Sequence, residues 1–198
     1  MKFKKALLAV SALASTTAFA DLSEQKDQYI GLEMGFGFGG DTLAEFQFDD
    51  GSTDSIDAGS GLFFGIDLLK PLHEQGQQPL FLKTGISYMF DSISAQNASA
   101  DFTRLPVDIA IATEVERWQF AAGATYHLNP TYEDDIAGGT KVKADNALGF
   151  TAEVAYTFAA GSGWKNTYFG LKYTNIEYDF NGLVFDGTGF ALTLGSTY

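Results

Sequence analysis

Eight charged residues stand singly among small residues in the body of the chain. Four are acidic and four are basic, so each charge can have a partner of opposite sign. A buried charge without a partner costs several kcal/mol, which predicts an ion-pair network wherever the chain brings these residues to one face. They are Glu33, Asp67, Asp108 and Glu153, together with Lys83, Arg104, Arg117 and Lys172.

Other residue types give little sign of a cofactor or a metal. The chain has no Cys, which excludes disulfides, thiolate zinc sites and cysteine nucleophiles. The run Asp49–Asp54 lacks the residue order and the bidentate Glu of a calcium loop, and the glycines of 35–40 alternate along one segment instead of forming a phosphate loop. A net charge of −13 argues against nucleic-acid binding, which needs a basic face. We predict no cofactor, no metal and no nucleic-acid partner.

The N-terminal segment has the pattern of a secretory signal peptide. Lys2, Lys4 and Lys5 precede a short apolar run at 6–14, and Ala18-Phe19-Ala20 fits the cleavage motif. The apolar run is too short for a spanning helix, which needs about 20 residues. We therefore predict a signal peptide at 1–20 and a single exported domain at 21–198.

The elements that must position the charges are strands, because apolar residues alternate with small or polar ones throughout the mature chain. Each segment has roughly the length with which a tilted strand crosses a bilayer, about 9–11 residues. Eight such segments predict an all-β fold, a closed antiparallel up-and-down eight-stranded transmembrane β-barrel. The segments are 30–38, 62–68, 82–90, 104–112, 117–126, 148–158, 168–174 and 189–198.

The two faces of these strands distinguish a membrane barrel from a soluble one. A soluble barrel also has one apolar face, but its other face should be densely charged. Here the apolar face carries no charge, and the other face is mostly Gly, Ala, Ser and Thr with the eight single charges. Small residues fit the narrow lumen of an eight-stranded barrel, so we predict that the apolar face meets lipid and the charges lie inside.

The connections alternate between long and short, as in outer-membrane barrels. The long ones are Gly39–Gly59, Asp91–Asp101, Asn129–Lys143 and Glu177–Asp186. Together with Asp145 they hold fifteen acidic residues, opposed only by Lys141 and Lys143. The short ones are Pro71–Gln78, Glu114–Glu116 and Ala159–Gly163. An acidic rim repels lipopolysaccharide phosphates, so we predict that any contact with that lipid is bridged by Mg²⁺ or Ca²⁺.

Aromatic residues gather at both ends of the predicted strands, as expected for rings at the headgroup levels of a bilayer. With the N-terminus in the periplasm, the periplasmic belt is Trp118, Tyr156, Phe158, Trp164 and Tyr198. The outer belt is Phe38, Phe64, Tyr88, Phe90, Tyr126, Phe150 and Tyr173.

The chain resembles the eight-stranded outer-membrane barrel families, such as the OmpA transmembrane domain and the OmpX-like and Opa-like barrels. The most specific part of the resemblance is the final strand, in which Phe190, Leu192, Leu194 and terminal Tyr198 look like the signal that the barrel-insertion machinery reads. The resemblance implies a monomer in the bacterial outer membrane with both termini in the periplasm and acidic loops outside the cell.

Two functions remain open, and an enzyme is a remote third. The first is a structural or surface-interaction barrel whose lumen is plugged by side chains. The second is a narrow channel for small or hydrophobic solutes, as similarity to the OmpW type would imply. His127 stands where a lipid-A-modifying barrel would have its histidine, but such a barrel would have Ser two positions later, and this chain has Asn129. His73 lies in a predicted turn and gives no sign of a catalytic role. We predict no enzymatic activity.

The strand register can be estimated if the connections close symmetrically. Asp67 is then opposite Lys83, and Lys83 is also opposite Asp108. Glu153 and Lys172 lie diagonally across the sixth and seventh strands. Opposed residues on one face have Cβ atoms about 4.5–5.5 Å apart, so this register predicts a charged barrier across the lumen at mid-depth.

Overall fold

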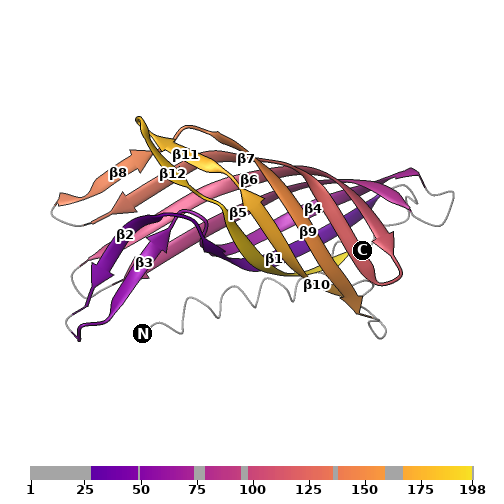
Figure 1. Cartoon of the computed structure of the whole chain (residues 1–198), viewed down its shortest axis with the longest axis horizontal. Helices are drawn as coiled ribbons and strands as arrows, with labels where there is room; N and C mark the ends of the chain where they lie inside the picture. The colour runs from indigo at the N-terminus through magenta and orange to yellow at the C-terminus, as the bar shows by residue number, and fades with distance from the viewer. Residues whose placement is uncertain are drawn as a thin grey trace.

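The computed structural model describes residues 28–48, 50–73, 79–94, 98–135, 138–158 and 167–197. Eight antiparallel strands form a closed barrel, in which each strand pairs with the next along the chain and the last pairs with the first (Figure 1). The predicted barrel is therefore confirmed. The barrel strands are β1 (Tyr29–Gly39), β4 (Gly61–His73), β5 (Leu80–Ser94), β6 (Ser99–Val115), β7 (Trp118–Asp134), β9 (Ala147–Phe158), β10 (Thr167–Asn175) and β13 (Gly189–Thr197).

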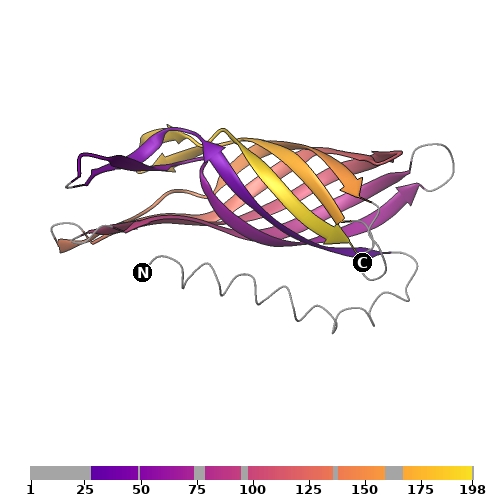
Figure 2. The ribbon, with the colours of Figure 1, turned by 90° about the horizontal axis from the view of Figure 1, so that it is seen from below.

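The strands have opposite inner and outer surfaces because successive side chains point to opposite faces of a strand. Within the described residues the outward positions are large and apolar, as at Phe36, Ile66, Ile109 and Phe120, each about half exposed. The inward positions of the same strands are buried or half-buried. The strands are tilted against the long axis of the barrel (Figure 2). No helix in the described ranges combines the length and hydropathy needed to cross a membrane.

The two ends of the barrel differ. At one end, which we call the turn end, β1 begins, β13 ends and β6 turns directly into β7. The described part of the other end, the loop end, continues past the barrel as a second structure, which we call the extension (Figure 1). It contains the outer parts of β5, β6 and β7 and five short strands. These strands are β2 (Thr42–Gln47), β3 (Thr53–Asp57), β8 (Thr140–Lys143), β11 (Glu177–Phe180) and β12 (Leu183–Asp186).

The extension corrects the prediction that the long connections are loops. Strands β5 and β6 stay paired as far as Ser94 and Ser99, and β8 pairs with the outer part of β7. The pairs β2–β3 and β11–β12 form two separate hairpins. Acids such as Glu45, Asp101 and Glu177 are exposed, while the neighbouring Phe46, Phe102 and Tyr178 are buried. The strand pattern therefore continues where the sequence appeared to be polar loop.

Candidate functional site

A network of charged side chains crosses the middle of the lumen. Lys83 Nζ on β5 lies 2.7 Å from Glu153 Oε2, 3.3 Å from Glu33 Oε2 and 3.5 Å from Asp67 Oδ2. Lys172 Nζ on β10 lies 2.6 Å from Asp108 Oδ2 and 4.0 Å from Glu33 Oε1. These side chains are only 5–13% exposed. We call the group the lumen network; its members are Glu33, Asp67, Lys83, Asp108, Glu153 and Lys172.

Glu33 connects the two halves of the network, and Tyr168 supports it. The Tyr168 hydroxyl donates a 2.8 Å hydrogen bond to Glu33 Oε2. Gly195 on the neighbouring strand makes room for the phenol, because a Cβ there would collide with the Tyr168 ring. Sequence reasoning missed Tyr168, although a large polar ring on a face of otherwise small residues was a usable signal.

The register differs from the predicted one. Asp67 and Asp108 both lie opposite Gly85, whereas Lys83 lies opposite Leu69 and Ala110. The prediction was wrong because neither connection folds back about the assumed centre, so that each pairing is offset by two residues. Strands β5 and β6 also stay paired as far as Ser94 and Ser99, inside the assumed loop. Lys83 still contacts Asp67 because its long side chain reaches the diagonal position.

Two further predictions about the network are corrected. Lys172 pairs with Asp108, so Asp108 is not a partner of Lys83 within the described contacts. Glu153 and Lys172 are directly opposed instead of diagonal, but the Glu153 carboxylate turns to Lys83.

The two predicted arginines lie outside the network. Arg117 lies exposed in the turn between β6 and β7, where Glu116 takes a left-handed conformation with φ of 58°. Arg104 does face the lumen, but its Nη2 donates to the Ser60 carbonyl at 2.7 Å. Four carboxylates therefore meet two lysines, and the predicted balance of four against four is wrong.

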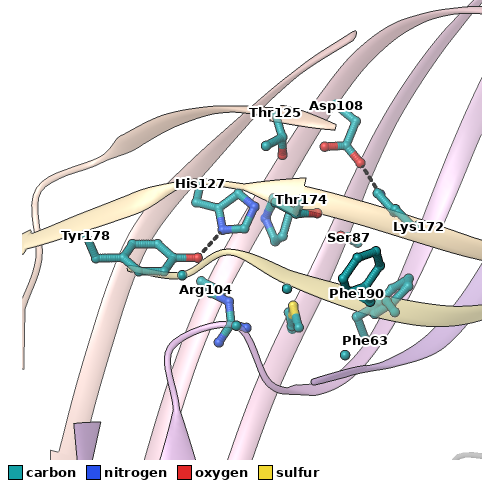
Figure 3. Close-up of a pocket in the computed structure, with 17 residues that line it drawn as sticks. Phe63, Ser87, Arg104, Asp108, Thr125, His127, Lys172, Thr174, Tyr178 and Phe190 are labelled. Atoms are coloured by element: carbon teal, nitrogen blue, oxygen red, sulfur yellow. Dashed lines mark hydrogen bonds and ion pairs between the residues drawn. The ribbon is translucent and has the colours of Figure 1, made fainter. Parts of the chain in front are cut away.

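Two cavities lie on opposite sides of the lumen network. The loop-side cavity, of about 40 Å³, is bordered by Lys172 and Asp108 and extends to Arg104, His127 and Tyr178 (Figure 3). The turn-side cavity, of about 20 Å³, is bordered by Lys83 and Glu153 and by residues such as Gln119 and Tyr168. A single water needs about 10–15 Å³ by this kind of measure, so each space holds only a few waters.

His127 is buried at the loop end of the lumen, on the predicted inward face of β7. Its Nδ1 lies 2.6 Å from the hydroxyl of Tyr178, which belongs to β11. The interaction attaches the β11–β12 hairpin to the barrel wall. The side chain of His73 lies outside the described residues.

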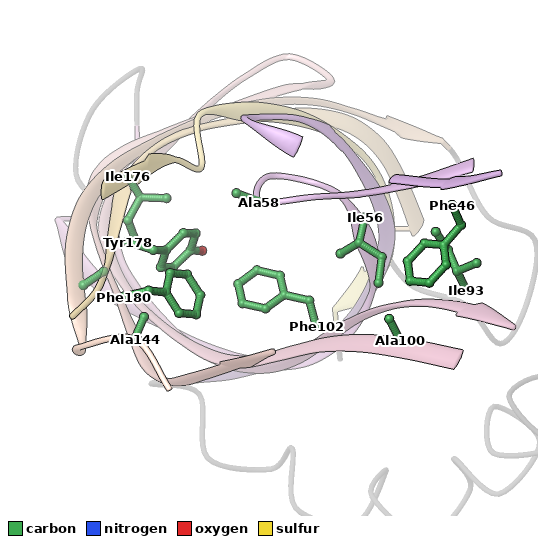
Figure 4. Packing of buried hydrophobic residues seen from close by; sticks show 11 residues of the cluster. Phe46, Ile56, Ala58, Ile93, Ala100, Phe102, Ala144, Ile176, Tyr178 and Phe180 are labelled. Atoms are coloured by element: carbon green, nitrogen blue, oxygen red, sulfur yellow. The ribbon is translucent and has the colours of Figure 1, made fainter. Parts of the chain in front are cut away.

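An apolar core fills the extension above this cavity. Ile56, Phe102 and Tyr178 have no exposed surface, and Figure 4 shows them pointing into the space enclosed by the strands. Phe102 and Tyr178 meet edge to face, with ring centroids 5.6 Å apart. The core joins residues of β2, β3, β5, β6 and β11, so the hairpins are packed together and do not act as independent loops.

The outer surface of the extension is acidic, and its carboxylates serve local turns. Asp186 Oδ1 accepts a hydrogen bond from the Thr188 amide, and bonds from the Thr188 hydroxyl and amide lower the pKa of Asp186. The Asp186 amide in turn donates to Asp41 Oδ2 at 2.8 Å, and the Asp41 amide donates to the Asp186 carbonyl at 2.6 Å. We call these two bonds the aspartate clamp. Among described residues no three carboxylates or histidines converge on a metal position.

The predicted aromatic belts occupy both ends of the apolar surface. At the turn end Trp118, Tyr156 and Phe158 form a chain of edge contacts, while Trp164 and Tyr198 lie outside the described residues. At the loop end Phe38 and Tyr173 both contact Phe190. The remaining outer-belt residues are Phe64, Tyr88, Phe90, Tyr126 and Phe150.

Of the predicted insertion signal, Phe190 thus joins the loop-end belt, and Leu192 and Leu194 face outward on β13. Sequence reasoning placed neither Phe190 nor the turn-end pair Tyr29–Phe81 in a belt.

Comparison with solved structures identifies the fold. Ail, the attachment invasion locus protein of Yersinia pestis, matches with a TM-score of 0.51 and 10% identity over 87% of this chain and 99% of that chain. The chain has the fold of the small outer-membrane β-barrels. Neisserial surface protein A (TM-score 0.49, 10% identity, 86% of this chain and 95% of that chain) and OprG of Pseudomonas aeruginosa (0.48, 11%, 87% and 96%) are further neighbours of this barrel. No protein-family model and no curated protein matches it.

Proposed function

We propose that this protein is an outer-membrane barrel with a sealed lumen, which anchors the extension at the cell surface as a structural or interaction module. The observation that carries the proposal is the lumen network, whose two lysines each hold carboxylates from different strands at mid-depth. Opening a path would separate buried ion pairs, which is strongly unfavourable.

The proposed membrane placement rests on the outer surface of the barrel. An uncharged apolar band with aromatic residues at both ends is what a bilayer requires. In this placement both termini lie in the periplasm, the acidic extension lies outside the cell, and the barrel acts as a monomer. The final strand would be read by the barrel-insertion machinery.

A narrow channel is the second candidate, and the two cavities on either side of the network favour it. Joining them would require Lys83 to release Glu153. An enzyme that modifies lipid A has less support, because His127 is 5% exposed and its Nδ1 is occupied by Tyr178.

The test is planar-bilayer conductance of the refolded protein. We expect a silent baseline for the natural sequence and for Lys141→Met, which removes an exposed lysine of the extension. Lys83→Met should show openings, since it removes the cation that joins three carboxylates. Steady unitary openings of the natural protein would favour the channel and overturn the sealed barrel.

We further propose that the extension contacts lipopolysaccharide through Mg²⁺ or Ca²⁺. The support is charge: its acids, such as Asp54 and Glu133, are exposed and would repel lipid phosphates without a bridging cation. Binding of the refolded barrel to lipopolysaccharide should fall when a divalent chelator is added and return with excess Mg²⁺. Binding that ignores the chelator would contradict this proposal.

A further inference from the structure

Arg104 is a buried cation of the lumen that the network does not use. It is only 2% exposed. Nη2 donates to the Ser60 carbonyl, and the guanidinium lies 4.5 Å from the centre of the Phe102 ring. Its Nε and Nη1 are buried and have no hydrogen-bond partner. Buried donors are almost always satisfied, so two free donors on one charged group indicate a missing partner.

The lining of the loop-side cavity carries an excess of positive charge. The charged groups that border the loop-side cavity are Arg104, Lys172 and Asp108, and the last two are paired at 2.6 Å. No carboxylate among the described side chains forms an ion pair with Arg104 within 4.0 Å. Asp91 attracts the guanidinium from a greater distance. One cation therefore faces the cavity without a direct counter-charge.

We propose that the loop-side cavity binds a small monovalent anion of chloride size, held by the free donors of Arg104. A volume of about 40 Å³ accommodates a halide ion or a few waters but neither a sugar nor a lipid headgroup. Thr125, Ser87 and Thr174 add polar groups to the lining of the cavity. The anion would neutralise the guanidinium and satisfy donors that the protein leaves empty.

The extension covers the proposed site from the loop end. Tyr178 and Phe102 belong to the apolar core of the extension. The Phe102 ring contacts the Arg104 guanidinium, and Tyr178 borders the cavity (Figure 3). The hydrogen bond between His127 and Tyr178 holds the Tyr178 side chain at this end of the cavity.

The first test is crystallographic and uses the natural sequence. The protein is refolded and crystallised in sodium bromide, and anomalous scattering locates the bromide. We expect an anomalous peak in contact with Nε or Nη1 of Arg104. Ordered water there without an anomalous signal, or bromide only on surface lysines, would overturn the proposal.

The second test measures thermal unfolding in detergent as chloride replaces gluconate at constant ionic strength. An ion that binds only the native state should raise the unfolding temperature by roughly 4 °C for each tenfold increase above its Kd. Arg104→Met should abolish this dependence, and Lys141→Met should keep it. Equal dependence in all three proteins would show surface screening instead of a site. If Arg104→Met fails to fold, the bromide result alone decides.

Discussion

The lumen and the extension are both buried interiors, but they are built from opposite kinds of side chain. The lumen holds the charges of the network, whereas the extension holds an apolar core around Ile56, Phe102 and Tyr178. Strand β6 shows the change within one element: Asp108 points inward beside outward Ile109, but further along Phe102 is buried beside exposed Asp101. The barrel is apolar outside as a bilayer demands, and the extension is apolar inside as water demands. The point along β6 at which the inward side chains change from charged to apolar therefore marks the outer edge of the proposed membrane.

The largest expected effect comes from breaking the lumen. Lys83→Met leaves Glu33, Asp67 and Glu153 without their shared cation, and removing one partner of a buried ion pair costs about 3–5 kcal/mol. We expect the unfolding temperature in detergent to fall by about 10 °C.

The control for this prediction is the exposed pair Lys141–Glu133, which is 2.6 Å long with side chains 57% and 55% exposed. Lys141→Met should cost less than about 1 kcal/mol, as exposed pairs do. Equal costs for the two variants would show that burial does not distinguish the two regions.

A cavity in the extension tests whether that region opens separately. Ile56→Ala should cost about 2–5 kcal/mol within the apolar core. Hydrogen exchange should accelerate at amides of β2, β3 and β11 while the barrel strands stay protected. Equal acceleration along β1 and β13 would mean that extension and barrel unfold as one unit.

The packing that supports Glu33 is tested at Gly195. A Cβ there meets the Tyr168 ring, so Gly195→Ala should displace the phenol and cost about 1–3 kcal/mol. In the Tyr168→Leu background the same substitution should cost much less, because contacting residues are not additive. Additive effects would contradict the proposed contact.

The smallest effect is expected at the Asp186 carboxylate, which accepts a hydrogen bond from the Thr188 amide beside the aspartate clamp. Because the native pKa of Asp186 lies below its unfolded value, its contribution is complete above the unfolded pKa, about 3.9, and is lost as the pH falls through the native pKa. Asp186→Asn should speed exchange of the Thr188 amide slightly at pH 7 and leave it unchanged at pH 2. A difference between the two proteins that persists at pH 2 would assign the effect to something other than charge.

The alternating residues were enough to predict the eight strands and which side of each faces inward. They could not fix the register, since the point at which each connection folds back and the length of the β5–β6 hairpin depend on packing. The extension was missed because residues such as Phe46 and Ile56 are scattered among acids, a pattern typical of loops.

Among the predicted lumen charges, Arg117 was placed on a strand. In the structure it lies in the two-residue turn Glu116–Arg117, and β7 begins only at Trp118. Arg104 has the correct face but lies too far along β6 to reach the lysine network. The alternating pattern predicts whether a side chain faces the lumen or the outside. Which partner the side chain reaches depends on its position along the strand.

The aspartate clamp has a consequence for the order in which the chain assembles. It lies just beyond Gly39 and Gly189, the last pair of the closing strands β1 and β13, and joins residues 145 positions apart in the sequence. Contacts between such distant segments lose more chain entropy than neighbouring hairpins do. We therefore expect the pairing of β1 with β13 to be the last to form. Until that step the paired hairpins form an open sheet. Pairing of β1 with β13 closes the sheet into a barrel, and the bonds between Asp41 and Asp186 then hold the closing strands together.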